Sequence, residues 1–348
     1  MSAGVLFRTC VARPSATALL IALVGALALA ALALGPVTIA PDRVVAAAFG
    51  GGAPMDAAIV QQIRAPRLAL GVVVGGALAL SGAALQGILR NPLADPGLIG
   101  VTAGGAVGAV SVIVLGGALS LQTPEALRPY LLPAAAFLGA GLVIALLFAL
   151  ARRAGETSVA TLILAGVAIN AIAGAVIGLL IYVSDDRQLR ELTFWSMGGL
   201  GAADWTVAGV TLILALAAAP LFFQMARSLD LMQLGERAAF HVGVDVERLK
   251  RRAALATALG VGAATAAAGP IGFVGLVAPH LARLTVGPSH RAMLPVAALY
   301  GVALVLVADL GVRLVAPPAE PPIGLATSLI GGPFFLWLLL RARRRILA

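Results

Sequence analysis

Cysteine and charged residues are both scarce in this sequence. Its 348 residues include one cysteine, Cys10, which excludes an internal disulfide framework and a cysteine cluster for zinc or iron–sulfur binding and leaves a free thiol. Charged residues make up 11% of the chain and hydrophobic residues 61%. At a mean hydropathy of +1.03, the chain cannot bury its apolar surface in one soluble core, so lipid must solvate much of it. The sequence predicts an all-α integral membrane protein.

Two further features are missing, a continuous basic face and a nucleotide-binding loop. The formal net charge is +9, but the arginines lie between apolar segments, as membrane topology requires, which argues against nucleic acid as a partner. No G-x-x-x-x-G-K-[ST] motif and no soluble domain is present. We therefore expect a single transmembrane domain over residues 1–348, surrounded by lipid and without enzymatic activity. If ATP powers its action, another chain must hydrolyse it.

Breaks of charge, proline and glycine separate about ten apolar segments, each near the roughly 20 residues that a membrane-spanning helix needs. The first is longer than the core of a secretory signal and further spans follow it, which favours an uncleaved helix. Gly269-Pro270 predicts a turn or a kink between two others. The predicted spans are Ala16–Leu34, Leu68–Ile88, Gly97–Leu119, Leu131–Leu150, Val159–Val183, Trp205–Ala226, Ala253–Ala268, Ile271–Thr285, Leu294–Leu314 and Ile323–Leu340.

The basic residues orient these spans. The last span is followed by four arginines, Arg341, Arg343, Arg344 and Arg345. Because basic residues are enriched in cytoplasmic segments, they predict a cytoplasmic C-terminus, and an even number of spans places the N-terminus on the same side. This topology assigns 17 of the 24 basic residues to the cytoplasm. Dropping one span would reverse every later loop and spoil the asymmetry.

Three predicted spans carry glycines four residues apart, namely Gly71 and Gly75, Gly104 and Gly108, and Gly174 and Gly178. Small residues at this spacing let helix backbones approach closely in lipid, so the pattern predicts a tight bundle and says nothing about substrate.

One long cytoplasmic loop, from Arg227 to Arg252, interrupts the spans. Its apolar positions predict short amphipathic helices separated by Gly235 and Gly243. This character suits the docking of a partner, and a solvated connector is the alternative interpretation.

Four blocks of sequence, in order and correctly spaced, resemble a known family over nearly the whole chain. They begin at Arg64, Leu192, Gly269 and Pro321 and read RAPRLALGVVVGGALALSGAALQGILRNPLADPGLIGVTAGGAVGA, LTFWSMGGLGAADW, GPIGFVGLVAPHLARLTVGPSHRAMLP and PPIGLATSLIGGPFFLWLL. In these blocks the chain is similar to the permeases of iron-siderophore, heme and cobalamin importers of the ABC superfamily, the FecCD family.

The resemblance implies a type II ABC importer permease fold and its partners. The expected assembly is a homodimer of ten-helix subunits in the bacterial inner membrane, with both termini in the cytoplasm and the translocation path on the axis shared with the second copy. Two cytoplasmic ATPase subunits would hold ATP and Mg, and a periplasmic binding protein would deliver the cargo. The chain itself would bind no cofactor and no metal.

Matching the family's motifs residue by residue assigns three sites. Arginines at the outer mouth would dock the binding protein, namely Arg64, Arg67 and Arg313, since charges at such a rim favour encounter and register more than affinity. For Arg64 and Arg67, snorkelling of the side chains to the membrane interface is the alternative. The cytoplasmic gate would comprise Asn91, Leu93, Thr157 and Ser158. Coupling to the ATPase would use Gly235, Glu236, Arg237 and Ala238, within a loop of about residues 229–250. ATP would then act by a population shift between permease conformations.

The segment SDDRQLRELTFWSMGGL from Ser184 resembles heme-importer permeases most. Arg187 and Arg190 in this segment would attract the propionates of heme at the substrate entrance. Gly199 departs from the pattern, in which serine is usual. Heme is therefore the first choice of cargo, ferric siderophores the second and cobalamin the third.

The evidence for other classes of membrane protein consists of single residues. Asp309 inside a span would suit a proton relay in an ion-coupled secondary transporter, but Arg313 four residues on predicts a neutralising ion pair. A channel is a further alternative. Three histidines, His241, His280 and His290, lie in or near the cytoplasm in this topology, and a structural role is favoured over ligation of heme or metal.

Overall fold

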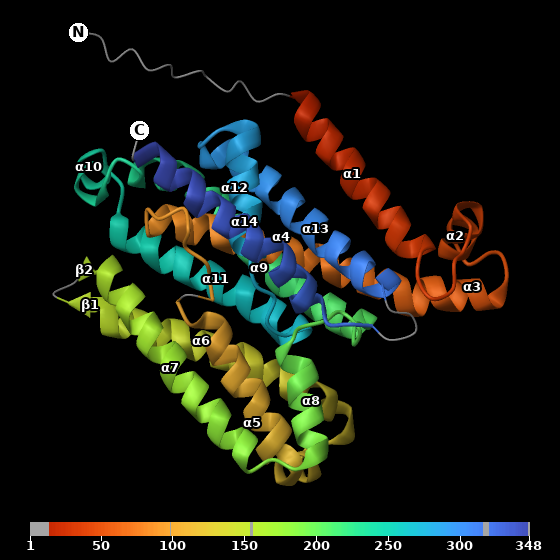
Figure 1. Cartoon of the computed structure of the whole chain (residues 1–348). Helices are drawn as coiled ribbons and strands as arrows, with labels where there is room; N and C mark the ends of the chain where they lie inside the picture. Colours follow the sequence, from red (N-terminus) through yellow and green to blue (C-terminus); the bar gives the residue numbers. More distant parts are fainter. Residues whose placement is uncertain (1–13, 98, 154–155, 316–319, 347–348) are drawn as a thin grey trace.

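The computed structural model describes residues 14–97, 99–153, 156–315 and 320–346 (Figure 1). Cys10, Arg8 and Arg13 lie outside these ranges. Long helices dominate, as the all-α prediction requires, and run lengthwise through the molecule. The strands of the described residues form one short antiparallel hairpin, β1 (Arg152–Arg153) with β2 (Glu156–Thr157), in which Arg152 pairs with Thr157.

All ten predicted spans are helical. The corresponding helices are α1 (Pro14–Ala33), α4 (Ala65–Ile88), α5 (Val101–Gln122), α6 (Arg128–Ala151), α7 (Val159–Tyr182), α9 (Trp205–Met232), α11 (Val246–Ala268), α12 (Val274–Val286), α13 (His290–Val315) and α14 (Ile323–Ile346). Within the described residues, six of these helices are long and apolar enough to cross a membrane, and three others are apolar but shorter. Ten crossings remain a prediction.

The remaining helices are short and lie between the long ones in sequence. They are α2 (Pro41–Ala48), α3 (Pro54–Ala58), the π-helical turn η1 (Ile59–Arg64), the 3₁₀ turn η2 (Glu125–Leu127), α8 (Asp186–Ser196) and α10 (Glu236–His241). α10 confirms the short helix predicted between Gly235 and Gly243. The structure also extends α9 to Met232 and starts α11 at Val246, because polar residues at these ends continue the helices beyond their apolar segments.

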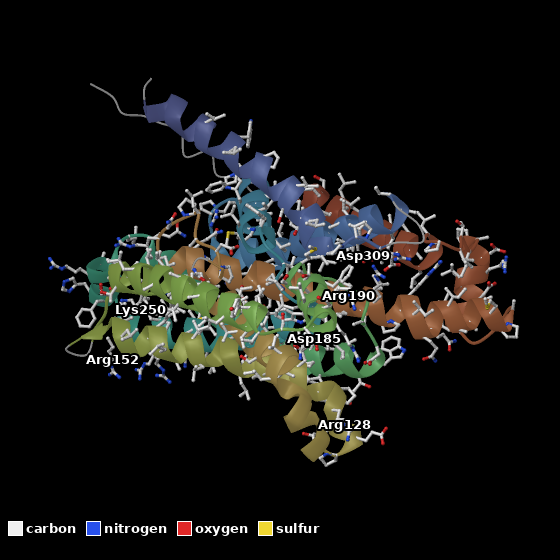
Figure 2. All side chains as sticks on the ribbon, turned by 60° about the horizontal axis from the view of Figure 1, so that its bottom comes forward. Arg128, Arg152, Asp185, Arg190, Lys250 and Asp309 are labelled. Atoms are coloured by element: carbon white, nitrogen blue, oxygen red, sulfur yellow. The ribbon has the colours of Figure 1, made fainter. Side chains whose placement is uncertain are left out.

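The two ends of the molecule carry different elements. α10 and the β1–β2 hairpin lie near one end, and α2, α3 and α8 lie toward the other (Figure 1). In Figure 2, Lys250 and Arg152 mark the first end, whereas Asp185, Arg190 and Asp309 lie away from it. In the predicted topology the first end is cytoplasmic and the second faces outward.

Helix α4 is the centre of the bundle and packs against α9, α11, α12 and α13. Close approach depends on glycine, as the spacing predicted. A Cβ at Gly75 would lie 2.5 Å from the carbonyl oxygen of Gly301 on α13, and one at Gly104 would lie 2.5 Å from that of Gly139 on α6. Gly174 and Gly178 on α7 differ, because a Cβ at either would meet nothing within 4 Å in the subunit.

The Gly269-Pro270 pair is a break between two helices. α11 ends at Ala268, and Gly269 follows with a φ of +66°, a conformation that favours glycine. A Cβ at Gly269 would lie 2.5 Å from the carbonyl oxygen of Trp195. The break therefore brings the end of α11 against the end of α8.

Candidate functional site

Two carboxylates hold the predicted docking residue Arg67. Its Nε donates to Asp309 Oδ1 at 2.8 Å and its Nη1 to Glu320 Oε2 at 2.5 Å. Asp309 also accepts from Arg313 Nη1 at 3.4 Å, which confirms the ion pair predicted from their spacing. Arg67, Asp309 and Arg313 are each at least 93% buried. The buried acid is thus neutralised by two arginines, an arrangement that weakens the case for a proton relay.

Backbone carbonyls hold the other docking residues. Arg64 donates to the carbonyl oxygens of Leu32 at 2.7 Å and Ala33 at 2.9 Å and to that of Val37, and it is 4% exposed. Arg313 donates to those of Ala31 and Leu34. These bonds tie the end of α1 to η1, directly before α4, and to α13. The structure thus differs from an open rim of charges: all three arginines are satisfied inside the subunit, and neither snorkelling nor free presentation describes them.

Helix α8 carries the predicted entrance residues. Asp185 and Gln188 form a capping box at its start, and Gln188 Nε2 donates to the carbonyl oxygen of Val114 on α5 at 3.1 Å. Leu192 is buried beneath the helix. This docking leaves Arg187 and Arg190 exposed, and no carboxylate among the described residues forms an ion pair with either. Both guanidinium groups are therefore available to an anionic group outside the subunit.

A cavity of about 310 Å³ lies at the end of α8. Its lining includes Phe194 and Trp195 of α8, Arg67 and Glu320 of the ion-pair cluster, and residues 267–269 at the end of α11. Aromatic and charged groups thus meet between α8 and Arg67.

The first predicted gate segment, residues 91–97, is a loop fastened by its own side chains. Asn91 Oδ1 accepts from the amide of Leu93 at 2.9 Å, and Asp95 Oδ1 accepts from that of Gly97 at 2.8 Å. Gln86 Nε2 donates to the carbonyl oxygen of Ala94 at 3.3 Å. Asn91 and Leu93 are half-buried.

The second predicted gate segment is the β1–β2 hairpin and the start of α7. Ser158 is exposed and caps α7, its Oγ accepting from the amide of Thr161 at 3.3 Å. Thr157 is 4% exposed and points the other way: its Oγ1 donates to Glu247 Oε2 at 2.6 Å and its amide to Glu247 Oε1 at 2.8 Å. Thr157 and Ser158 thus have different roles. Ser158 is a cap, and Thr157 fixes the hairpin to α11.

Lys250 joins this hairpin to the predicted coupling segment. Its side chain is 1% exposed, and Nζ donates to the carbonyl oxygen of Thr157 at 2.6 Å, to Glu236 Oε2 at 2.8 Å and to Glu247 Oε1 at 3.4 Å. Partial burial by itself raises the pKa of Glu247, but the hydrogen bonds from Thr157 and the charge of Lys250 outweigh it and lower that pKa below its ordinary value. One ammonium group therefore connects β2, α10 and α11.

The predicted coupling segment also lies close to the first predicted gate segment. Gly235 begins α10 with a φ of +108°, and a Cβ there would lie 3.5 Å from Nη1 of Arg90, directly before that loop. Arg237 and Ala238 are exposed. An open cleft of about 760 Å³ runs beside α10, lined by Glu236, Arg237, Phe240, His241 and residues 243–247. The predicted coupling residues therefore lie between a surface cleft and both gate segments.

Sequence reasoning did not identify Lys250 and Glu247 as functional residues. A signal was present: Lys250 is the single lysine of the chain, three residues from Glu247 and inside the coupling loop. The contact with Thr157 spans more than 90 residues of sequence, so the pattern alone could not supply it.

The histidines have structural surroundings. His290 is buried, and its Nδ1 lies 2.7 Å from Asp230 Oδ1 of α9. His280 packs edge-on to Phe334, and His241 to Phe240. Within the described residues, no three His, Cys, Asp or Glu side chains form a group that could hold a metal ion.

The apolar helices are those of a multi-pass membrane protein, and comparison with known proteins gives its family. The model of the FecCD transport family matches residues 19–341. This chain belongs to that family.

Curated relatives of the chain are named as permeases of importers for different substrates. The chain is 48% identical to the hemin transport system permease protein HmuU of Yersinia pestis over 81% of this chain and 83% of the relative. It is 42% identical to the cobalamin import system permease protein BtuC of Halobacterium salinarum, over 81% and 73%, and 41% identical to the vitamin B12 import permease BtuC of Escherichia coli O9:H4, over 84% and 86%.

A solved structure shares the fold. It is described as an inward-facing conformation of a metal-chelate type ABC transporter and matches with a TM-score of 0.83 at 31% identity, over 94% of this chain and 99% of that one. The relatives are permease subunits of ABC importers, and this chain is an ABC importer permease of the same family.

Proposed function

We propose that this chain forms the membrane pathway of an ATP-driven heme importer. The main support for heme as the cargo is the 48% identity to a hemin permease, compared with 42% or less for the cobalamin permeases named above. Two features of α8 support it: the exposed Arg187 and Arg190, and the aromatic rings of Phe194 and Trp195 in the lining of the cavity at its end. Guanidinium groups pair well with carboxylates such as the heme propionates.

The binding protein is proposed to dock by replacing the present hydrogen-bond acceptors of Arg64, Arg67 and Arg313 with its own carboxylates. Their present partners are Asp309, Glu320 and the carbonyls at the end of α1. An incoming carboxylate would have to compete with these groups. Glu320 is the most accessible of them, with 34% of its side chain exposed, so its pair with Arg67 is the first that we expect to open.

The second copy is proposed to pack on α7. This helix presents Gly174, Ala175 and Gly178 on an exposed face, and a Cβ at either glycine would meet nothing within 4 Å in the subunit. Small residues at this spacing suit close helix contact in a membrane. Only 22% of the α7 span is buried inside the subunit.

Coupling is proposed to run from the ATPase through α10 to both gates. Movement of Glu236 on α10 would be transmitted through Lys250 to the carbonyl oxygen of Thr157, and movement of Gly235 to Arg90. The partner's ATP-bound state then shifts the gates by the difference in its contacts with the two permease conformations.

Transport assays in vesicles test this function. The chain is reconstituted with its ATPase and binding protein, and uptake of heme, a ferric siderophore and cobalamin is measured with ATP and with a non-hydrolysable analogue. We expect ATP-dependent uptake of heme. Cobalamin is the second candidate, because several relatives above 40% identity import it. Uptake of cobalamin or siderophore without heme would overturn the cargo alone. Cargo flux without any ATPase subunit would indicate a channel or secondary transporter.

A further inference from the structure

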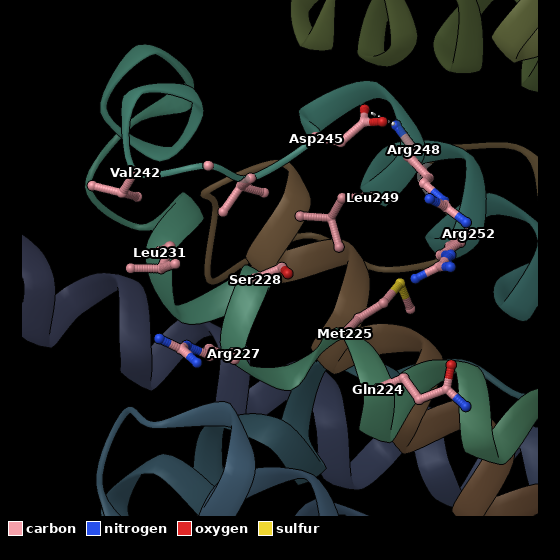
Figure 3. A pocket seen from close by; sticks show the side chains of 12 residues that line it. Gln224, Met225, Arg227, Ser228, Leu231, Val242, Asp245, Arg248, Leu249 and Arg252 are labelled. Carbon is pink, nitrogen blue, oxygen red and sulfur yellow. Dashed lines mark hydrogen bonds between the residues drawn. The ribbon is translucent and has the colours of Figure 1, made fainter.

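A pocket of about 280 Å³ lies where the cytoplasmic ends of α9 and α11 meet (Figure 3). Three arginines line it: Arg248 and Arg252 lie one turn apart on α11, and Arg227 lies on α9 at the other side, with its side chain directed away from these two (Figure 3). Gln224 and Ser228 add neutral polar groups. Met225, Leu231, Val244 and Leu249 add apolar side chains to the lining.

The three guanidinium groups have no anionic partner in the described part of the subunit. None forms an ion pair there, in contrast to Arg43, Arg67 and Arg313. One carboxylate, Asp245, also lines the pocket, and its Oδ1 accepts from the backbone amide of Arg248 at the start of α11. Three guanidinium groups and one carboxylate give the lining a net charge of +2. The pocket is therefore suited to an anion.

The position of the pocket indicates where the anion comes from. The predicted span of α9 ends at Ala226, and that of α11 begins at Ala253, so Arg227 and Arg252 directly adjoin the two apolar segments. This is the level of lipid headgroups in the cytoplasmic leaflet. Basic pockets between membrane helices on this side are suited to anionic phospholipid headgroups.

We propose that this pocket binds the phosphate of an anionic phospholipid headgroup. Arg248 and Arg252 would hold the phosphate oxygens, and Arg227, Ser228 and Gln224 on α9 would contact the glycerol or its second phosphate. The acyl chains would follow the apolar surface of α9 toward the bilayer. The volume lies just below the roughly 300–1,000 Å³ of small-molecule sites, which suits a headgroup rather than a large cargo. A bound headgroup would bridge the two helices that flank α10. The proposal does not depend on the identity of the cargo.

Native mass spectrometry of the full-length chain in detergent tests the site. Cardiolipin, phosphatidylglycerol, phosphatidylcholine and inorganic phosphate are titrated separately. The pocket variant carries Arg227→Gln and Arg252→Gln. The matched control carries Arg251→Gln and Arg291→Gln, which removes the same charge from exposed cytoplasmic arginines outside the pocket.

We expect the wild type to retain cardiolipin and phosphatidylglycerol in preference to phosphatidylcholine. Because each basic residue near a membrane surface contributes about 1 kcal/mol to the binding of anionic lipid, the pocket variant should bind cardiolipin about 10- to 30-fold more weakly. The control should stay within about twofold of the wild type.

Three outcomes would overturn the proposal. Equal losses in the pocket variant and the control would mean general attraction by surface charge without a defined site. Equal retention of phosphatidylcholine would remove the anion preference. Inorganic phosphate that binds as tightly as cardiolipin would identify a site for a free anion instead of a lipid. Both variants should unfold at the same temperature as the wild type, which verifies that weaker binding does not come from misfolding.

Discussion

Replacement of Lys250 by methionine should separate ATP hydrolysis from transport. Methionine keeps an unbranched apolar stem of similar length and removes the ammonium group that contacts Thr157, Glu236 and Glu247. Removal of one member of a fully buried ion pair costs about 3–5 kcal/mol. The side chains of Glu236 and Glu247 remain 35% and 25% exposed, so water compensates them in part. We expect a loss of about 2 kcal/mol in the free energy of unfolding.

The effect on coupling follows from the same contacts. If the link through Lys250 supplies about 1.4–2 kcal/mol of the free energy that couples α10 to the hairpin, its loss reduces cargo imported per ATP hydrolysed by about 10- to 30-fold. ATP hydrolysis by the assembled transporter should persist. The assay measures uptake and phosphate release in the same proteoliposomes.

The control is Arg251→Met, the exposed neighbour on the same helix, which should keep the wild-type ratio. Thermal unfolding in detergent measures how much folded protein remains at the assay temperature. An unchanged ratio of uptake to hydrolysis in the Lys250 variant would refute the coupling role. A parallel fall of both rates with the loss of folded protein would assign Lys250 to stability alone.

Three further predictions concern packing, pH and entry. Gly75→Ala should lower the free energy of unfolding by about 1–3 kcal/mol through overpacking against α13. Gly76→Ala, where a Cβ would meet nothing within 4 Å, should not lower the temperature of thermal unfolding, because alanine inside a helix is at least as favourable as glycine. Because the pKa of Glu247 is lowered in the folded state, the stabilisation that its carboxylate gives the fold is present above the ordinary pKa of 4.5 and is lost as the pH falls below that value. Thermal unfolding of Glu247→Gln should therefore depend less on pH below 4.5 than that of the wild type. Identical pH profiles for the variant and the wild type would contradict this. Arg187→Gln with Arg190→Gln should reduce heme uptake severalfold and leave ATP hydrolysis intact, and full uptake would remove the entrance assignment.

Much of the fold follows from sequence because apolar length and helix breaks are local. The ten predicted segments are all helical, and glycine spacing predicted the contacts of α4 and α5. The short helices α2, α3 and α8 were not predicted, because they lie in polar connections where periodicity is weak. Their positions depend on contacts such as that between Gln188 and α5.

The site was predictable only as separate motifs. Family likeness predicted a coupling helix at residues 235–238 and a gate position for Thr157, but the connection between these two segments through Lys250 depends on a contact distant in sequence. Likewise, sequence placed Arg67 at the outer mouth as a free charge. Burial against Asp309 and Glu320 arises from the packing of α4 on α13 and from the position of Glu320 just before α14, which no local pattern records.

Labelling from the two sides of sealed inner-membrane vesicles tests the central claim, that α10 faces the ATPase and α8 faces the binding protein. Cys10 is replaced by serine, and single cysteines are introduced as Arg237→Cys on α10 and Arg190→Cys on α8. A membrane-impermeant maleimide should react with the α10 cysteine only from the cytoplasmic side, with protection by bound ATPase subunits, and with the α8 cysteine only from the opposite side. Reaction of the α10 cysteine from the outer side, or of both cysteines from the same side, would contradict the topology and the coupling role built on it.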